Sequence, residues 1–265
     1  MAIDFAFLDS GTGGIPYMLY LKQKCPAANV VYLADSKHFP YGTKSPRQVT
    51  ECALEAAGAA VAAWSPGTVV VACNTISVTA LDALRVQFPG VPVVGTVPAI
   101  KLAAAVTENG RIGLLATEGT VRNPYVDRLI HDFAADCTVI RRGDAELVSF
   151  VEHRCFSAAH AERLAAVRPA IDFFSGQGCD TVILGCTHFL HLVAEFEEAA
   201  GPALRVVDSR SGVVRRALEV ARPCDCSAAD PLDKTLFVTG GAASEPEYRL
   251  VCAGMGLRWG GALCP

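Results

Sequence analysis

The stretch VVVACNT at positions 69–75, together with its counterpart VILGCTH at positions 182–188, decides the expected fold. Each begins with an apolar run and ends in a small residue, a cysteine and two polar residues. Short apolar runs without polar alternation are typical of strands buried on both faces, as in a parallel sheet covered by helices. Two such stretches, far apart in one chain, indicate two similar α/β lobes that each place one cysteine at a strand end.

The same alternation of elements continues along the chain. Strands are predicted at Ile3–Leu8, Val30–Ala34, Val69–Ala72, Val91–Gly95, Arg111–Ala116, Thr138–Arg141, Asp180–Gly185, Leu204–Val207 and Thr235–Thr239. Helices are predicted at Ile15–Lys24, Pro46–Trp64, Ser77–Phe88, Val97–Thr107, Arg122–Ala134, Ala158–Gln177, Phe189–Ala199 and Ser211–Ala221. The fold class is therefore predicted to be α/β, with mostly parallel sheets flanked by helices.

Composition and charge exclude several kinds of protein. The 265 residues are 51% hydrophobic and 19% charged, which excludes wholesale disorder. The formal net charge is −4, so nucleic acid is not expected as the main partner. No apolar run reaches the length of a membrane span, and Asp4 interrupts the only N-terminal stretch that resembles a signal peptide. We therefore expect no membrane partner and a cytoplasmic location.

Eleven cysteines are scattered singly through apolar contexts, which indicates free thiols rather than a disulfide framework. The pair Cys224 and Cys226 has the spacing of metal ligands, but no second pair accompanies it. No metal site is therefore predicted.

Several predicted strands end in small polar residues, where ligands of open α/β sheets usually bind. These ends are Asp9-Ser10-Gly11, Cys73-Asn74-Thr75, Thr96, Thr117 and Cys186-Thr187-His188. Any one of them could merely cap the following helix, but together they indicate a ligand site. The glycine-rich turn at 11–14 suits an anion, although it lacks the spacing of nucleotide-binding loops.

Two thiols at such positions could serve as bases. A helix N-terminus favours the thiolate form of a cysteine, and two bases on opposite sides of one carbon can invert its configuration. A redox pair fits less well because no Cys-x-x-Cys is present, whereas His188 leaves a cysteine hydrolase open. Buried structural thiols are a further alternative. Taken alone, Pro40-Tyr41-Gly42 is a turn, and Glu152-His153 are surface residues.

These motifs together resemble those of the glutamate racemases, within the wider aspartate/glutamate racemase superfamily. The resemblance extends from Asp9 to about Thr239. It is carried, in order and spacing, by Asp9-Ser10-Gly11, Pro40-Tyr41-Gly42, Cys73-Asn74-Thr75, Val94-Gly95, Val97-Pro98-Ala99-Ile100, Ala116-Thr117, Thr120, Glu152, Gly185-Cys186-Thr187-His188 and Asp208-Ser209.

The resemblance implies an enzyme that interconverts L- and D-glutamate without a cofactor and supplies the D-isomer for peptidoglycan. Cys73 would take the α-proton from D-glutamate and Cys186 from L-glutamate. Asp9 would assist Cys73, and His188, with Glu152 behind it, would assist Cys186. The residues implied to bind the substrate are Ser10, Tyr41, Gly42, Asn74, Thr75, Thr117, Thr120 and Thr187.

The resemblance also implies how the chain divides. One lobe would comprise residues 1–97 and 208–265, the other residues 98–207, with the active site in the cleft between them. Because members of the family often form dimers, a homodimer is one expectation. Two alternatives stay open: a racemase or isomerase of the same superfamily that acts on aspartate or maleate, and a non-catalytic regulatory protein that binds an amino acid.

Overall fold

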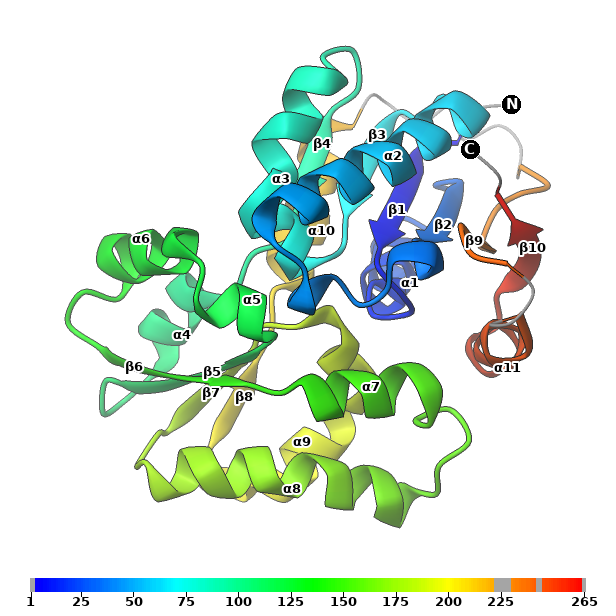
Figure 1. Ribbon diagram of the computed structural model, residues 1–265. Coiled ribbons are helices and arrows are strands. Elements are labelled where there is room, and N and C mark those ends of the chain that lie inside the picture. The colour runs from blue at the N-terminus through cyan, green and yellow to red at the C-terminus, as the bar shows by residue number, and fades with distance from the viewer. Residues whose placement is uncertain (1–2, 222–229, 242–244, 264–265) are drawn as a thin grey trace. The chain divides into compact units, whose positions relative to one another are not determined.

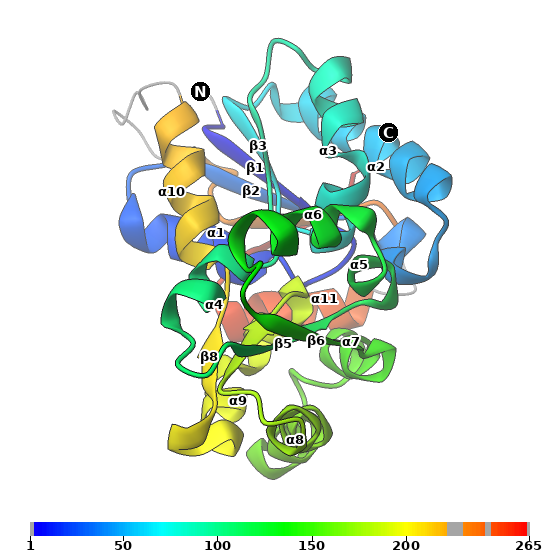
Figure 2. The same cartoon turned by 90° about the vertical axis from the view of Figure 1, so that its left-hand side faces the viewer.

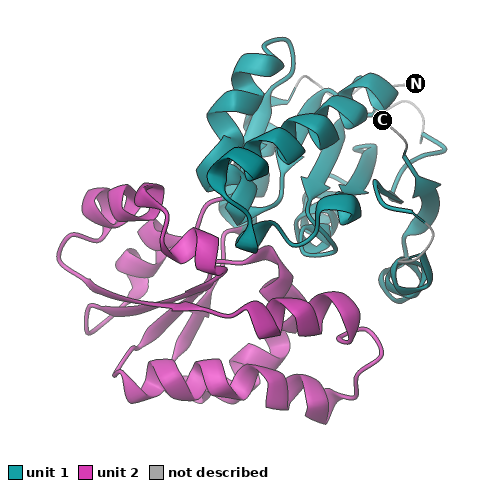
Figure 3. Cartoon of the chain, in the orientation of Figure 1, with its two compact units in different colours: residues 1–96, 210–265 teal, residues 97–209 magenta. Residues whose placement is uncertain are grey.

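The computed structural model describes residues 3–221, 230–241 and 245–263. Figure 1 labels its helices and strands along the chain. The chain forms two compact units, coloured separately in Figure 3. Unit 1 comprises residues 1–96 and 210–265, and unit 2 comprises residues 97–209. The pair Cys224 and Cys226 lies outside the described residues.

Unit 1 is built on a six-stranded sheet with the order β10-β9-β2-β1-β3-β4, in which all pairs are parallel. The strands are β1 (Phe5–Asp9), β2 (Val30–Ala34), β3 (Thr68–Val71), β4 (Val93–Gly95), β9 (Thr235–Val238) and β10 (Arg258–Ala262). Every residue of β1, β2 and β3 is buried, which explains why these strands lack polar alternation.

Helices cover both faces of this sheet, as Figure 2 shows, with α1 and α10 on one face and α2 and α3 on the other. The helices of unit 1 are α1 (Ile15–Lys24), α2 (Pro46–Trp64), α3 (Asn74–Gln87), α10 (Arg210–Val220) and α11 (Glu245–Met255), with 3-10 turns at Ser36–His38 and Tyr41–Thr43. Capping residues in the sequence set the start of helix α2. Ser45 and Gln48 form a reciprocal capping box, and Pro46 occupies the first turn.

Unit 2 contains a four-stranded sheet with the order β6-β5-β7-β8, again entirely parallel. Its strands are β5 (Arg111–Ala116), β6 (Thr138–Gly143), β7 (Thr181–Leu184) and β8 (Arg205–Val207). Its helices are α4 (Ile100–Val106), α5 (Glu118–Val121), α6 (Pro124–Phe133), α7 (Ala145–His153), α8 (His160–Gly176) and α9 (Val193–Ala200), with 3-10 segments at Thr187–Leu192 and Gly201–Ala203. Figure 1 shows α4 and α6 on one face of this sheet and α8 and α9 on the other.

The predicted α/β class, with parallel sheets flanked by helices, is confirmed. The apolar pattern does not predict α7, α11 or β10. Strand β10 alternates between exposed and half-buried residues and carries two glycines at a register shift, so it lacks the signature of a buried strand. The predicted helix over 189–199 is shorter than expected, because residues 187–192 form a 3-10 segment and α9 begins at Val193.

Because each sheet is wholly parallel, all its strands end at the same edge. In unit 1, β1 ends at Asp9, and Asp35, Cys73 and Thr239 follow β2, β3 and β9. In unit 2, Thr117 follows β5 and Cys186 follows β7. Each unit therefore gathers its strand-end polar residues at one edge. Within the described residues, no helix is both long and apolar enough to cross a bilayer.

Candidate active site

Cys186 is the first of three buried side chains of unit 2 that contact one another in series. Its Sγ lies 3.8 Å from Nδ1 of His188, and Nε2 of His188 lies 3.0 Å from Oε2 of Glu152. The exposed fractions are 4% for Cys186, 2% for His188 and 5% for Glu152. A thiol, an imidazole and a carboxylate are thus linked in series away from bulk water, which is an arrangement that can hold and move a proton.

The protonation of His188 follows from this setting. Burial by itself would lower the pKa of His188, but hydrogen bonds to Cys186 and Glu152 and the negative charges of both groups outweigh it. The net effect raises the pKa of His188 well above its ordinary value. The imidazole is therefore held protonated and can donate to the sulfur of Cys186.

Glu152 lies in the last turn of α7 and not on the surface, so its interpretation as a surface residue is wrong. Helix α7 begins at an N-cap where Asp144 accepts a hydrogen bond from the backbone N–H of Leu147. It packs against the 3-10 segment that carries His188, which brings the two side chains together. The burial of a carboxylate is stabilised here by its imidazole partner.

Cys73 follows β3 and forms the N-cap position of α3 in unit 1. Its side chain is 5% exposed, and its carbonyl accepts from the N–H of Ser77 in the first turn. Cys73 therefore lies at the N-terminus of α3, where the partial positive charge of a helix favours a thiolate. Cys186 differs, because a 3-10 segment and not an α-helix follows it. The side chain of His188 lies beside its sulfur.

Asp9 ends β1 beside β3, where Leu8 pairs with Val71. It is fully buried, and its Oδ1 accepts from the backbone N–H of Ser10 at 2.6 Å. The Oγ of Ser10 also lies 3.4 Å from this oxygen. Asp9 and Ser10 therefore form one polar pair at the strand end next to the one that bears Cys73.

The hydroxyl of Tyr32 stabilises the glycine-rich turn that follows Ser10. Oη of Tyr32 donates to the carbonyl of Gly11 at 2.8 Å and accepts from the N–H of Gly14 at 2.9 Å. A side chain at Gly14 would place Cβ 2.7 Å from Cβ of Ala72. Close packing against Ala72 and the Tyr32 hydroxyl thus explains the glycine at 14.

Two polar residues in the first turn of α3 are buried next to Cys73. Asn74 is 3% exposed and Thr75 is 5% exposed. Neither side-chain oxygen nor nitrogen of Asn74 has a hydrogen-bond partner among the described residues. An unsatisfied buried amide costs about 1–3 kcal/mol, so this position is suited to a polar ligand.

Tyr41 and Gly42 lie in a 3-10 turn of unit 1, just before α2. Tyr41 is 1% exposed, and its hydroxyl donates to Oδ2 of Asp35 at 2.5 Å. Burial, followed by the charge of Asp35 and the hydrogen bond to it, raises the pKa of Tyr41. Its hydroxyl therefore remains neutral.

The threonines of unit 2 occupy two strand ends. Thr117 caps α5, where its Oγ1 accepts from the N–H of Thr120 at 3.2 Å and donates to Oγ1 of Thr120 at 3.0 Å. Thr187 follows Cys186 and is 1% exposed. Unit 2 thus brings Thr117 and Thr120 together and sets Thr187 between Cys186 and His188.

Two residues of unit 1 that contact predicted site segments, Tyr32 and Asp35, were not predicted from the sequence. Asp35 directly follows strand β2, and Asp9 ends strand β1. The position of an aspartate at a strand end is therefore the sequence feature by which Asp35 could have been predicted. Among the residues that the structure describes, no group of three or more His, Cys, Asp or Glu side chains could hold a metal ion.

Comparison with known proteins identifies relatives over nearly the whole chain. Residues 19–217 match the family model described as Asp/Glu/Hydantoin racemase. The glutamate racemase of Treponema pallidum (strain Nichols) is 40% identical over 98% of this chain and 96% of its own length. That of Proteus mirabilis (strain HI4320) is 38% identical over 78% of this chain and 72% of its own length.

Solved structures show the same similarity. Escherichia coli glutamate racemase, in complex with L-glutamate and an activator, UDP-MurNAc-Ala, has a TM-score of 0.85 and 32% identity. The alignment covers 98% of each chain. Glutamate racemase isoform RacE1 from Bacillus anthracis has a TM-score of 0.80 and 25% identity, covering 99% of this chain and 97% of its own.

Proposed function

The chain belongs to the Asp/Glu/hydantoin racemase family, and we propose that it interconverts L- and D-glutamate with Cys73 and Cys186 as its two bases. The observation that carries the proposal is the buried series Cys186–His188–Glu152, which equips one thiol to exchange a proton. Both curated relatives named above are glutamate racemases, which favours glutamate over aspartate or maleate as the substrate.

Each turnover needs one thiolate and one thiol. With D-glutamate, the Cys73 thiolate removes the α-proton, and the carbon–hydrogen bond becomes a carbanion electron pair. The Cys186 thiol then delivers its proton to the opposite face of that carbon and becomes a thiolate. One proton is lost and one is gained, so the reaction needs no oxidant or reductant. The conversion of L-glutamate reverses these steps.

His188 supports the half of the reaction that involves Cys186. A protonated imidazole stabilises the Cys186 thiolate that forms when this residue gives up its proton. Glu152 keeps the imidazole charged and oriented through its contact with Nε2. Glu152 thus acts as a positioning residue behind His188.

Asp9 assists Cys73, as His188 assists Cys186. Support for this comes from the pairing of β1 with β3, which sets the end of one strand beside the end of the other. The N–H of Ala72 donates to the carbonyl of Leu8 at 2.8 Å, directly before both residues. A carboxylate there can accept a proton, or it can accept a hydrogen bond from the ammonium of the substrate.

Hydroxyl, amide and main-chain groups bind the substrate in this proposal. Glutamate offers two carboxylates and an ammonium, which need several donors and at least one acceptor. The unsatisfied amide of Asn74 supplies both kinds of group in the first turn of α3. The remaining groups come from Ser10, Tyr41, Gly42, Thr75, Thr117, Thr120 and Thr187.

The biological setting is part of the same proposal. The D-glutamate formed would enter bacterial peptidoglycan synthesis, and the enzyme would act in the cytoplasm as a homodimer. No cofactor takes part, since the two thiols alone move the proton.

Proton exchange in D2O tests the reaction. The enzyme is incubated with L-glutamate without added cofactor and in the presence of a metal chelator, and deuterium at Cα and the yield of D-glutamate are measured. Wild type should incorporate deuterium and form the D-isomer, whereas Cys73→Ala and Cys186→Ala should each abolish racemisation. Cys179→Ala, which removes another buried thiol of unit 2, should racemise like wild type.

Three outcomes would contradict the proposal. Full racemisation by either Cys73→Ala or Cys186→Ala would overturn the two-base mechanism. Glutamate binding without deuterium incorporation would indicate a non-catalytic binding protein. Faster turnover of aspartate or maleate than of glutamate would assign another activity within the family.

A further inference from the structure

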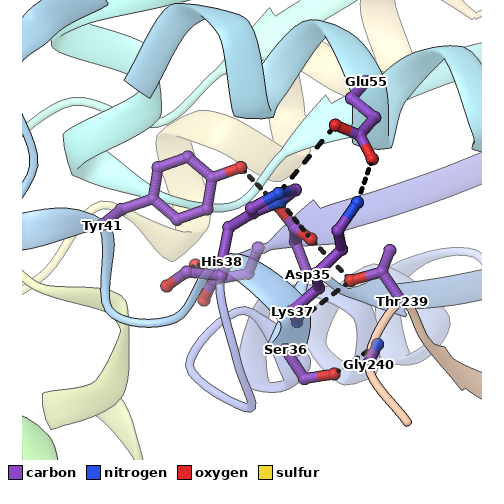
Figure 4. Close-up of polar contacts among 10 residues, drawn as sticks. Asp35, Ser36, Lys37, His38, Tyr41, Glu55, Thr239 and Gly240 are labelled. Carbon is purple, nitrogen blue, oxygen red and sulfur yellow. Dashed lines mark hydrogen bonds and ion pairs between the residues drawn. The ribbon is translucent and has the colours of Figure 1, made fainter. Parts of the chain in front are cut away.

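A network of polar side chains in unit 1 is centred on Asp35, which the mechanism above does not use. Figure 4 shows His38, Tyr41 and Thr239 turned toward this carboxylate. Asp35 follows β2 and is fully buried. A carboxylate buried this deeply must be compensated by donors, since removal from water is unfavourable for its charged form.

Three donors meet the two oxygens of Asp35. Oδ2 accepts from the Tyr41 hydroxyl at 2.5 Å and lies 2.9 Å from Nδ1 of His38. Oδ1 accepts from Oγ1 of Thr239 at 2.5 Å. None of these partners is a lysine or arginine, so oriented hydrogen bonds satisfy the oxygens of this carboxylate.

The contact with Tyr41 links Asp35 to a proposed substrate-binding segment. Tyr41 begins the short turn that contains Gly42, and its ring is buried with only its hydroxyl reaching the carboxylate. Because that hydroxyl is engaged by Asp35, the ring has one defined position. By fixing the ring of Tyr41, Asp35 therefore also fixes the main chain of Tyr41 and Gly42.

Thr239 brings a second, distant part of the chain to the same point. Besides donating to Asp35, its Oγ1 accepts from the N–H of Lys37 at 3.2 Å. The neighbouring Gly240 donates its N–H to Oγ of Ser36 at 2.9 Å. A side chain at Gly240 would place Cβ 2.6 Å from that oxygen, so the close approach requires glycine. The segment after β9 thereby fixes the Ser36–His38 turn.

We propose that Asp35 is a positioning residue for substrate binding: through the Tyr41 hydroxyl it fixes the Tyr41–Gly42 segment, and Thr239 holds Asp35 in turn. This inference rests on the proposed function, because only that function brings Tyr41 and Gly42 into contact with glutamate. It assigns a role in the site to the segment after β9, near the C-terminal end of the chain.

Steady-state kinetics of conservative variants test the role. Asp35→Asn keeps the size and one acceptor but loses the charge, Tyr41→Phe loses the hydroxyl, and Thr239→Val loses the third donor. Each should raise KM for both glutamate isomers at least about fivefold while changing kcat less than about twofold. The double variant Asp35→Asn/Tyr41→Phe should raise KM no further than the more severe single variant, because both changes remove one contact.

Two control variants separate positioning from general damage. Thr239→Ser restores the donor and should return KM to the wild-type value. Glu55→Gln breaks the exposed ion pair with Lys37 in the same network and should leave KM unchanged. If Asp35→Asn keeps wild-type KM, or if kcat falls while KM does not change, the positioning role is wrong.

A spectroscopic measurement keeps the test independent of activity. In protein labelled with 3-fluorotyrosine, the Tyr41 fluorine signal is the one that Tyr41→Phe removes. Thr239→Val should shift this signal, Thr239→Ser should restore it, and an unmoved signal would contradict the network even if a variant of Asp35 fails to fold. Failure of the wild type to exchange the α-proton would instead overturn the proposed function.

Discussion

Nε2 of His188 lies 3.0 Å from Oε2 of Glu152, and the two side chains are almost completely buried. They are separated by 36 positions and come from a 3-10 segment and from α7. Their contact connects a carboxylate in the interior of unit 2 to the thiol of Cys186. The protonation of this pair is therefore central to the proposed reaction.

Glu152→Gln should shift the alkaline limb of the pH–rate profile to lower pH. The charge of Glu152 helps to raise the pKa of His188, so its removal lets the imidazole lose its proton at lower pH. The measurement is kcat/KM for L-glutamate as a function of pH. Glu146→Gln, an exposed change on the same helix, should keep the wild-type profile, and identical profiles for both variants would count against the assignment.

Asn74→Ala should separate stability from function. The Asn74 amide forms no hydrogen bond within the described structure, and alanine is the better helix former. The free energy of unfolding should stay the same or rise by up to about 1 kcal/mol, whereas KM for glutamate should rise. Urea unfolding and steady-state kinetics measure the two effects.

Ser77→Ala is the matched comparison on α3, because Oγ of Ser77 accepts from the N–H of Thr96 at 2.8 Å. Its loss should destabilise the protein by about 1–3 kcal/mol. Should Asn74→Ala destabilise as much as Ser77→Ala, Asn74 is a structural residue and not a ligand-binding one.

Gly14→Ala should reduce both stability and racemisation. Its Cβ would lie 2.7 Å from Cβ of Ala72 and 2.9 Å from the carbonyl oxygen of Ala72, directly before Cys73. Overpacking of this kind costs about 1–3 kcal/mol and displaces the neighbouring main chain. Thermal unfolding and kcat/KM report the two losses.

Gly58→Ala in α2 is the control for this prediction, since its Cβ would come no closer than 3.9 Å to the Phe88 ring. Alanine in a helix interior is more stable than glycine by about 0.8–1.0 kcal/mol, so this variant should gain stability and keep its activity. Equal behaviour of the two variants would refute the steric argument.

Asp180→Asn should destabilise the protein more near neutral pH than in acid. Burial opposes the charge of Asp180, but hydrogen bonds from the Thr107 hydroxyl and from the N–H groups of Glu108 and Asn109 more than compensate and lower its pKa. A lowered pKa in the folded state means that this stability is present above the unfolded pKa of about 3.9. It is lost as the pH falls through the folded value.

Urea unfolding at pH 7 and at pH 2.5 measures this difference. The gap between wild type and Asp180→Asn should be about 1–3 kcal/mol at pH 7 and should narrow at pH 2.5. The exposed Asp172→Asn should match wild type at both pH values. A gap that does not depend on pH would show that the aspartate charge contributes nothing.

The sequence by itself determined most of the strands and helices, although not α7, α11 or β10, and the residues that follow the strands. Apolar strands such as Val69–Ala72 are local patterns, and the polar residues that follow them, including Cys73 and Cys186, are read directly from the chain. Parallel strands then imply a shared edge, which is how Asp9 and Thr117 entered the candidate site. The resemblance to a known family added Glu152, which pattern alone assigns to the surface.

Only the tertiary structure decided which distant groups meet. The order β10-β9-β2-β1-β3-β4 sets Thr239 against Asp35, 204 positions away, and the packing of α7 against the 3-10 segment sets Glu152 against His188. Local sequence determines backbone preference, whereas such contacts depend on how whole elements pack to bury their apolar faces. For that reason the local pattern could place Cys73 and Cys186 at strand ends, whereas the contacts of Glu152 with His188 and of Thr239 with Asp35 could not be read from it.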